Sequence, residues 1–179
     1  MRWIWIDKFV EFESGHRAVA RKNVTLGELH VSDYFLGPAT LPSSLVLEGL
    51  AQTGGILVAE ANQFEHRVVL AKVSRASFLR DPRPGDCLNY TALLKQIQPD
   101  GAIVEASAHV DRTLVAQAKL VFAHLGQDVV DSLFDPAELL QMLHLWRLFD
   151  VGCGTDGLPL QIPSKLHATA AAESLSTSR

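Results

Sequence analysis

The 179-residue sequence contains only two cysteines, Cys87 and Cys153, and they lie far apart. Two thiols allow one bridge at most, which is no disulfide framework, and neither has other ligand types around it at a metal-binding spacing. These absences predict a reduced, cytoplasmic protein with two ordinary thiols. They also give no indication of a metal or of an organic cofactor.

Long apolar runs and clusters of basic residues are missing as well. No apolar stretch reaches the length of a membrane span, and the apolar segment at the start is interrupted by Asp7 and is too short for a signal peptide. The formal net charge is -4 without any run of lysines and arginines, so nucleic acid is not an expected partner. An acidic carrier protein would have to be held by a local basic patch, which the total charge does not reveal.

Hydrophobic residues make up 47% of the chain and charged residues 20%, as in ordinary globular proteins of one domain. Apolar patterning and turn residues predict six strands, two before residue 25 and four after residue 65: Phe9–Glu13, Arg17–Val24, His66–Leu79, Cys87–Ile97, Ala102–Val110 and Thr113–Leu125. Short connections between such strands favour a mainly antiparallel sheet. After Pro42, an apolar helix is predicted from Ser43 to Ala61. The predicted fold class is therefore α+β, with a sheet that wraps one long helix.

A second helix is predicted from Asp135 to Phe149, because its first residue suits an N-cap, Pro136 suits the first turn and apolar residues follow at helical spacing. Two interpretations of this helix stay open: it packs on its own domain, or it contributes to an oligomer interface. The composition beyond it indicates little order. We predict a main domain over residues 1–127, a C-terminal helical extension over 128–152 and a flexible tail over 153–179.

Glu48 stands among apolar residues in the first turns of the helix that begins at Ser43. A helix that is apolar nearly all round is expected to be buried. Since burying an unpaired carboxylate is costly, such a group usually has a partner or a task. Gln52 lies one turn further on and faces Glu48, which would make a purely structural pair. The alternative is that Glu48 is a functional carboxylate.

The residues around this helix resemble the active-site motif of the 3-hydroxyacyl-acyl-carrier-protein dehydratases. That family carries a His-Phe-Pro-Gly turn and a Met-Pro-Gly whose proline lies eight residues after the His. A helix follows, with a Glu or Asp that lies fourteen residues after the same His and is followed by Ala-Gln. The corresponding residues here, in the same order and spacing, are Tyr34-Phe-Leu-Gly37, Leu41-Pro-Ser43, Glu48 and Ala51-Gln52. Lys22–Thr25 and Arg83–Asp86 resemble family features before and after the motif, so the resemblance covers about residues 5–125.

The resemblance implies a hotdog fold, in which a long central helix is wrapped by a mainly antiparallel sheet, here with an extra C-terminal helix. It also implies a dimer or dimer-based oligomer that removes water from a 3-hydroxyacyl thioester of acyl carrier protein or coenzyme A, in fatty acid or related acyl-chain synthesis. By the same resemblance Glu48, contributed by the other subunit, assists the C3 hydroxyl. The N–H of Ser43 polarises the thioester carbonyl, as a helix N-terminus favours negative charge. The substrate-contacting positions would be Phe35, Gly37, Pro42 and Gln52.

Tyr34 stands where the family has its catalytic His. A phenol is protonated at neutral pH and is a poor base. Three explanations are open. Tyr34 acts with altered roles while Glu48 takes over the base duty, His30 on the same loop substitutes for the missing base, or catalysis has been lost.

The sequence therefore leaves rivals to a dehydratase. The first is a catalytically impaired subunit that binds an acyl chain or stabilises an active partner. The second is a hotdog acyl thioesterase in which Glu48 activates water, because those enzymes also place a helix carboxylate near the thioester. Double-bond formation, thiol release and the effect of Tyr34→His distinguish the three.

Overall fold

The structure is a computed structural model that describes residues 4–27, 39–125, 136–163 and 166. The strands are β1 (Lys8–Glu13), β2 (Arg17–Asn23), β3 (Arg67–Phe78), β4 (Cys87–Gln98), β5 (Gly101–Val110), β6 (Thr113–Leu125) and β7 (Gly152–Cys153). The helices are α2 (Ser43–Ala61), α3 (Pro136–Leu145) and α4 (Leu148–Val151). None of the helices in these described ranges combines the length and the apolarity needed to cross a membrane.

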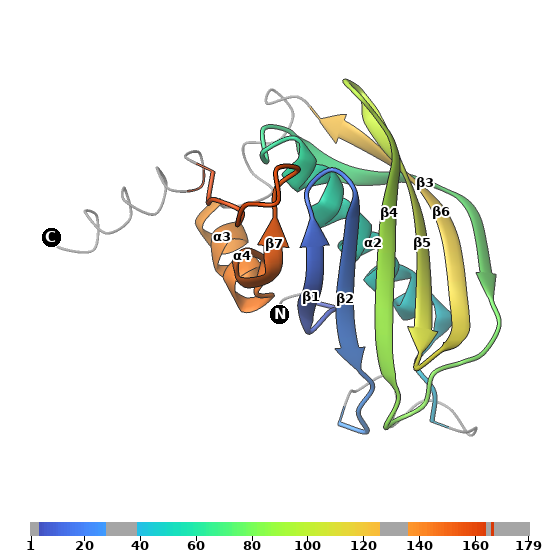
Figure 1. The fold of residues 1–179 in the computed structure, drawn as a ribbon. Coiled ribbons are helices and arrows are strands. Elements are labelled where there is room, and N and C mark those ends of the chain that lie inside the picture. Colours follow the sequence, from blue (N-terminus) through green and yellow to red (C-terminus); the bar gives the residue numbers. More distant parts are fainter. Residues whose placement is uncertain (1–3, 28–38, 126–135, 164–165, 167–179) are drawn as a thin grey trace, which may run out of the picture.

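The seven strands form one sheet in the order β3-β6-β5-β4-β2-β1-β7, and every neighbouring pair except β1–β7 is antiparallel. Period-two alternation explains the sheet, since one side of each strand faces the core. On β5 the buried side chains are those of Ala102, Val104, Ala106, Ala108 and Val110. The long helix α2 lies across the inner face of this sheet (Figure 1). The predicted α+β hotdog architecture is confirmed.

Helix α2 approaches the sheet closely because two of its glycines carry no side chain toward it. A Cβ atom at Gly49 would lie 2.4 Å from Cζ of Tyr90, a fully buried residue of β4. A Cβ at Gly54 would lie 3.2 Å from Val104 and 3.3 Å from Phe122. The glycines therefore let the helix sit against bulky residues of the central strands.

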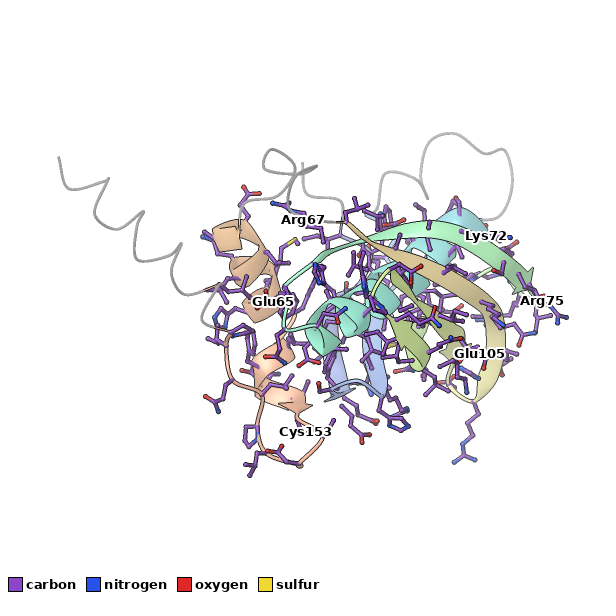
Figure 2. All side chains as sticks on the ribbon, turned by 90° about the horizontal axis from the view of Figure 1, so that it is seen from above. Glu65, Arg67, Lys72, Arg75, Glu105 and Cys153 are labelled. Carbon is purple, nitrogen blue, oxygen red and sulfur yellow. The ribbon has the colours of Figure 1, made fainter. Side chains whose placement is uncertain are left out.

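The two edges of the sheet differ. Strand β3 has a neighbour on one side only among the described residues, and most of its residues are exposed. Apolar side chains on this strand, Val69, Leu70, Val73 and Phe78, are 37–40% exposed. The basic residues Arg67, Lys72 and Arg75 follow its course at the margin of the molecule (Figure 2). At the opposite edge, β1 is covered by β7 and the C-terminal helices (Figure 1).

The prediction of a single helix from Asp135 to Phe149 is wrong. The structure has two helices, α3 and α4, which are separated at Trp146 and Arg147. Arg147 has a left-handed backbone with φ of 60°, which ends α3. The carbonyl oxygen of Trp146 accepts a hydrogen bond from the N–H of Phe9 at 2.8 Å. This bond to β1 lies outside the helical pattern, and it fixes the chain where the helix breaks. The packing interpretation of α3 is thus supported, since Leu140 and Leu143 belong to the main core.

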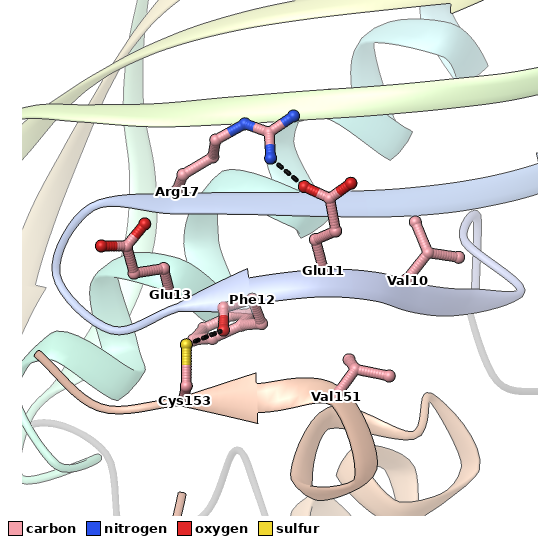
Figure 3. Close-up of a pocket in the computed structure, with 7 residues that line it drawn as sticks. All are labelled: Val10, Glu11, Phe12, Glu13, Arg17, Val151 and Cys153. Atoms are coloured by element: carbon pink, nitrogen blue, oxygen red, sulfur yellow. Dashed lines mark hydrogen bonds and ion pairs between the residues drawn. The ribbon is translucent and has the colours of Figure 1, made fainter. Parts of the chain in front are cut away.

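The first part of the predicted flexible tail, from Cys153 to Leu160, makes defined backbone contacts with β1 and with Gly152. Strand β7 pairs with Phe12 and Glu13 of β1, and the N–H of Ser14 donates to the carbonyl of Cys153 at 2.9 Å. The backbone of Cys153 also forms an isolated antiparallel β-bridge with Pro159. The thiol of Cys153 donates to the carbonyl oxygen of Phe12 at 3.5 Å, a contact drawn as a dashed line in Figure 3. We call residues 136–163 the C-terminal unit.

Candidate active site

The N-terminal end of α2 is held in place by the loop between β3 and β4. The N–H of Leu41 donates to the carbonyl of Pro82 at 2.7 Å, and the hydroxyl of Ser43 donates to Asp81 at 3.3 Å. Pro42 precedes the helix with φ of -55° and ψ of 140°, and no side chain caps the helix. Among the described residues, none accepts a hydrogen bond from the N–H of Ser43. An uncapped first turn of this kind favours an anionic ligand oxygen.

Glu48 is half-buried in the second turn of α2 and is oriented by a short chain of hydrogen bonds. The side-chain amide of Gln52 donates to Glu48 Oε1 at 3.1 Å. The backbone N–H of Trp5 in turn donates to Gln52 Oε1 at 2.8 Å. Because Trp5 supplies a donor, the carbonyl end of the Gln52 amide must face Trp5 and its NH₂ must face Glu48. The pair predicted from the four-residue spacing is present, with a third member from the N-terminal segment.

Glu48 and Ser43 both lie in the first two turns of α2. The two residues are five positions apart, which is about 7.5 Å along a helix axis. Helical side chains point back toward the N-terminus, so the carboxylate of Glu48 reaches toward the first turn. At about 100° per residue, the two positions lie about 140° apart around the helix, so their common feature is nearness to its N-terminal end.

The predicted site residues divide into two groups. Pro42, Ser43, Glu48 and Gln52 lie together on the first turns of α2. Tyr34, Phe35 and Gly37 lie outside the described residues, as does His30, so their predicted roles stay predictions. Among the described residues, no three His, Cys, Asp or Glu side chains gather in a way that could hold a metal ion.

The fully buried carboxyl of α2 is Glu60, which the sequence analysis missed. Its side chain is only 3% exposed, and its Oε2 has no hydrogen-bond partner among the described residues. Burial raises the pKa of Glu60, and a hydrogen bond with Ser14 only partly opposes this. The buried stripe of the helix could have revealed it, since the members at helical spacing are Val46, Leu50, Thr53, Leu57 and Glu60.

The sheet and the long helix across it define a hotdog protein, with a carboxylate near the N-terminal end of the central helix. Residues 3–119 match the model of the FabA-like domain, and the chain belongs to this family. The 3-hydroxyacyl-[acyl-carrier-protein] dehydratase FabZ of Latilactobacillus sakei is 36% identical over 118 residues, which cover 65% of this chain and 84% of that protein. FabZ of Campylobacter concisus is 34% identical over 125 residues, which cover 66% and 84%. The predicted resemblance is confirmed, and the chain is dehydratase-like.

Solved structures agree on the fold. The protein smu.793 of Streptococcus mutans, bound to acetyl CoA, matches with a TM-score of 0.58 and 16% identity over 70% of this chain and 94% of that one. The conserved protein PA5202 of Pseudomonas aeruginosa matches with a TM-score of 0.56 and 19% identity over 66% and 87%. The C-terminal unit lies outside the range that the family model matches.

Proposed function

We propose that this protein removes water from a 3-hydroxyacyl thioester carried by acyl carrier protein or coenzyme A. One observation supports this most directly: Glu48, which accepts a hydrogen bond from Gln52, lies five residues after Ser43, the first residue of the uncapped helix. Both curated relatives described above are named as 3-hydroxyacyl-[acyl-carrier-protein] dehydratases. The pathway we propose is fatty acid or related acyl-chain synthesis.

Glu48 acts as the base in this proposal. The Gln52 amide donates to Oε1 of this carboxylate and restrains its orientation. Glu48 takes the proton from C2, and the negative charge that develops on the thioester oxygen is stabilised by the N–H of Ser43. Tyr34, protonated at neutral pH, gives its phenolic proton to the C3 hydroxyl, which leaves as water. Proton return from Glu48 to the phenolate then restores the starting state.

Two copies of the chain complete the proposed site. Strand β3 is a twelve-residue strand at the sheet edge with exposed apolar side chains, and long exposed edges of this kind are usually covered. Pairing of β3 with its copy continues the sheet into a homodimer, in which Tyr34 of one protomer faces Glu48 of the other. The exposed Lys72 and Arg75 on β3 supply positive charge for an acidic carrier protein (Figure 2).

The test is an assay of the purified full chain with 3-hydroxybutyryl and crotonyl thioesters of acyl carrier protein and of coenzyme A. Formation of the double bond and release of free thiol are followed in parallel. We expect dehydration that is lost in both Glu48→Gln and Tyr34→Phe. Thiol release without dehydration would instead identify a thioesterase, and a silent wild type that gains activity in Tyr34→His would identify a non-catalytic subunit.

A further inference from the structure

The N-terminal segment from Ile4 to Phe9 runs between the candidate site and the C-terminal unit. Near its start, the N–H of Trp5 donates to Gln52 Oε1 at 2.8 Å. At its end, the N–H of Phe9 donates to the carbonyl of Trp146 at 2.8 Å. Only three residues therefore separate a contact to the site from a contact to a unit that lies outside the family match.

The segment is fixed along its length as well as at its ends. Ile6 and Phe9 are each 1% exposed and belong to the main core. The ring of Trp146, which is 3% exposed, packs edge-on against Phe9 with centroids 6.4 Å apart. Asp7 ties the middle to β2, because its N–H donates to Arg21 and its carboxylate accepts from Asn23. The backbone at Trp5 is thereby held in one place.

The hydrogen bond from Trp5 restrains the position of Gln52 Oε1, while the NH₂ on the other side of the same amide donates to Glu48. If Trp5 moved away, the Gln52 side chain would lose this restraint and could adopt other rotamers. The hydrogen bond to Glu48 Oε1 would then be formed for only part of the time. Correct orientation of Glu48 therefore depends on a backbone group far from it in the sequence.

We infer that residues Ile4–Phe9 form a positioning strap, through which the C-terminal unit holds Gln52 in the orientation that directs Glu48 toward the ligand. Gln52 is then a positioning residue. Trp146 acts on the site indirectly, because it contacts Phe9 at the end of the strap. This inference rests on the proposed function for its kinetic consequence. Its structural content, the locked amide, is measurable without any substrate.

The test compares Trp146→Ala with Trp146→Phe and with Leu145→Ala, a matched change at a neighbouring side chain that is 59% exposed. Amide hydrogen exchange at Trp5 is followed by NMR in the folded full-length protein. In Trp146→Ala and in Gln52→Leu, exchange at Trp5 is expected to be about tenfold faster, which corresponds to the loss of one ordinary hydrogen bond. Trp146→Phe keeps an aromatic edge on Phe9 and is expected to restore the wild-type rate, and Leu145→Ala is expected to leave it unchanged.

Kinetics supply the second readout. The kcat of Trp146→Ala is expected to fall about tenfold with KM nearly constant, and to recover in Trp146→Phe. Wild-type exchange and kcat in folded Trp146→Ala would overturn the strap. If that variant does not fold, Asp7→Ala, which loosens the strap at an exposed site, is judged by the same two criteria. A wild type without dehydration would overturn the proposed function, while exchange at Trp5 would still decide on the strap.

Discussion

Glu48 and Glu60 lie on the same helix, about 18 Å apart along its axis, yet their surroundings are opposite. Glu48 is half-buried, accepts a hydrogen bond from Gln52 and lies close to the uncapped end of the helix. Glu60 is 3% exposed at the other end and has an oxygen without a partner among the described residues. The better-buried carboxylate is thus the one with little access to solvent.

The difference separates two reasons for a carboxylate in an apolar helix. Glu48 shares the half-buried side of α2 with Gln52 and Ile56, a side that a second copy of the chain could cover. Glu60 belongs to the stripe that packs against the sheet. Burial raises the pKa of Glu60, but a raised pKa alone does not make a catalytic group, because a reacting carboxylate must also be reached.

The largest expected effect is on activity, at Glu48. Glu48→Gln keeps the shape of the side chain and removes the base, so kcat should fall by about 10²–10⁴. The midpoint of thermal unfolding should change little, since the side chain is only half-buried. Steady-state dehydration and a thermal melt measure the two effects. Glu60→Gln is the control. If it reduced kcat by as much as Glu48→Gln, the contrast between the two glutamates would be wrong.

Ser43 sharpens the comparison at the open end of the helix. Ser43 is the first helical residue, where proline is tolerated, and the backbone of Pro42 suits a following proline. Ser43→Pro therefore removes the N–H donor without breaking the helix, and kcat should fall by about 10²–10³. Ser43→Ala keeps the N–H and loses only the hydrogen bond to Asp81, so it should retain activity. Equal kcat in the two variants would exclude this N–H as the oxyanion donor.

The sequence patterns predicted the fold better than the chemistry of the site. The α2 bounds of Ser43 and Ala61 are confirmed, because the proline and the apolar run are local signals. The break at Arg147 was missed, since it depends on a hydrogen bond from Phe9 in a distant strand. The pairing of β7 with β1 was missed for the same reason.

The candidate site shows the same division. Motif spacing identified Glu48, and the four-residue spacing identified its contact with Gln52. The bond from Trp5 to Gln52 joins residues 47 positions apart, so no local pattern contains it. Helical periodicity places Glu60 on the buried side of α2, but the motif spacing indicates only Glu48.

Substitution of Gly49 tests how closely the N-terminal half of α2 must approach the sheet. Gly49→Ala places a Cβ within 2.6 Å of the Tyr90 hydroxyl oxygen, so the helix or the ring must shift, at a cost of about 1–3 kcal/mol. Gly55→Ala is the matched control, because its Cβ would meet Phe122 at an ordinary 3.4 Å. Urea unfolding should show Gly49→Ala destabilised and Gly55→Ala unchanged or more stable. Adding Tyr90→Leu should relieve much of the Gly49→Ala defect, and a purely additive loss would contradict the close contact.

The smallest expected effect concerns Glu60 and depends on pH. The folded state raises the pKa of Glu60 above its ordinary value of 4.5, so the folded protein holds this proton more tightly than the unfolded chain does. The contribution of Glu60 to stability is therefore complete below about pH 4.5, and it declines as the pH rises through the folded-state pKa. Gln cannot titrate, so the free energy of unfolding of Glu60→Gln, relative to that of the wild type, should increase as the pH rises across this window.

Urea unfolding of wild type and Glu60→Gln at a series of pH values measures this difference directly. Glu105→Gln provides the control, because Glu105 is an exposed glutamate whose ion pair with Lys95 is worth little. The free energy of unfolding of Glu105→Gln, plotted against pH, should run parallel to that of the wild type. Parallel curves for Glu60→Gln as well would mean that Glu60 reaches water or an unseen partner in solution, and the contrast between the two ends of α2 would then lose its physical basis.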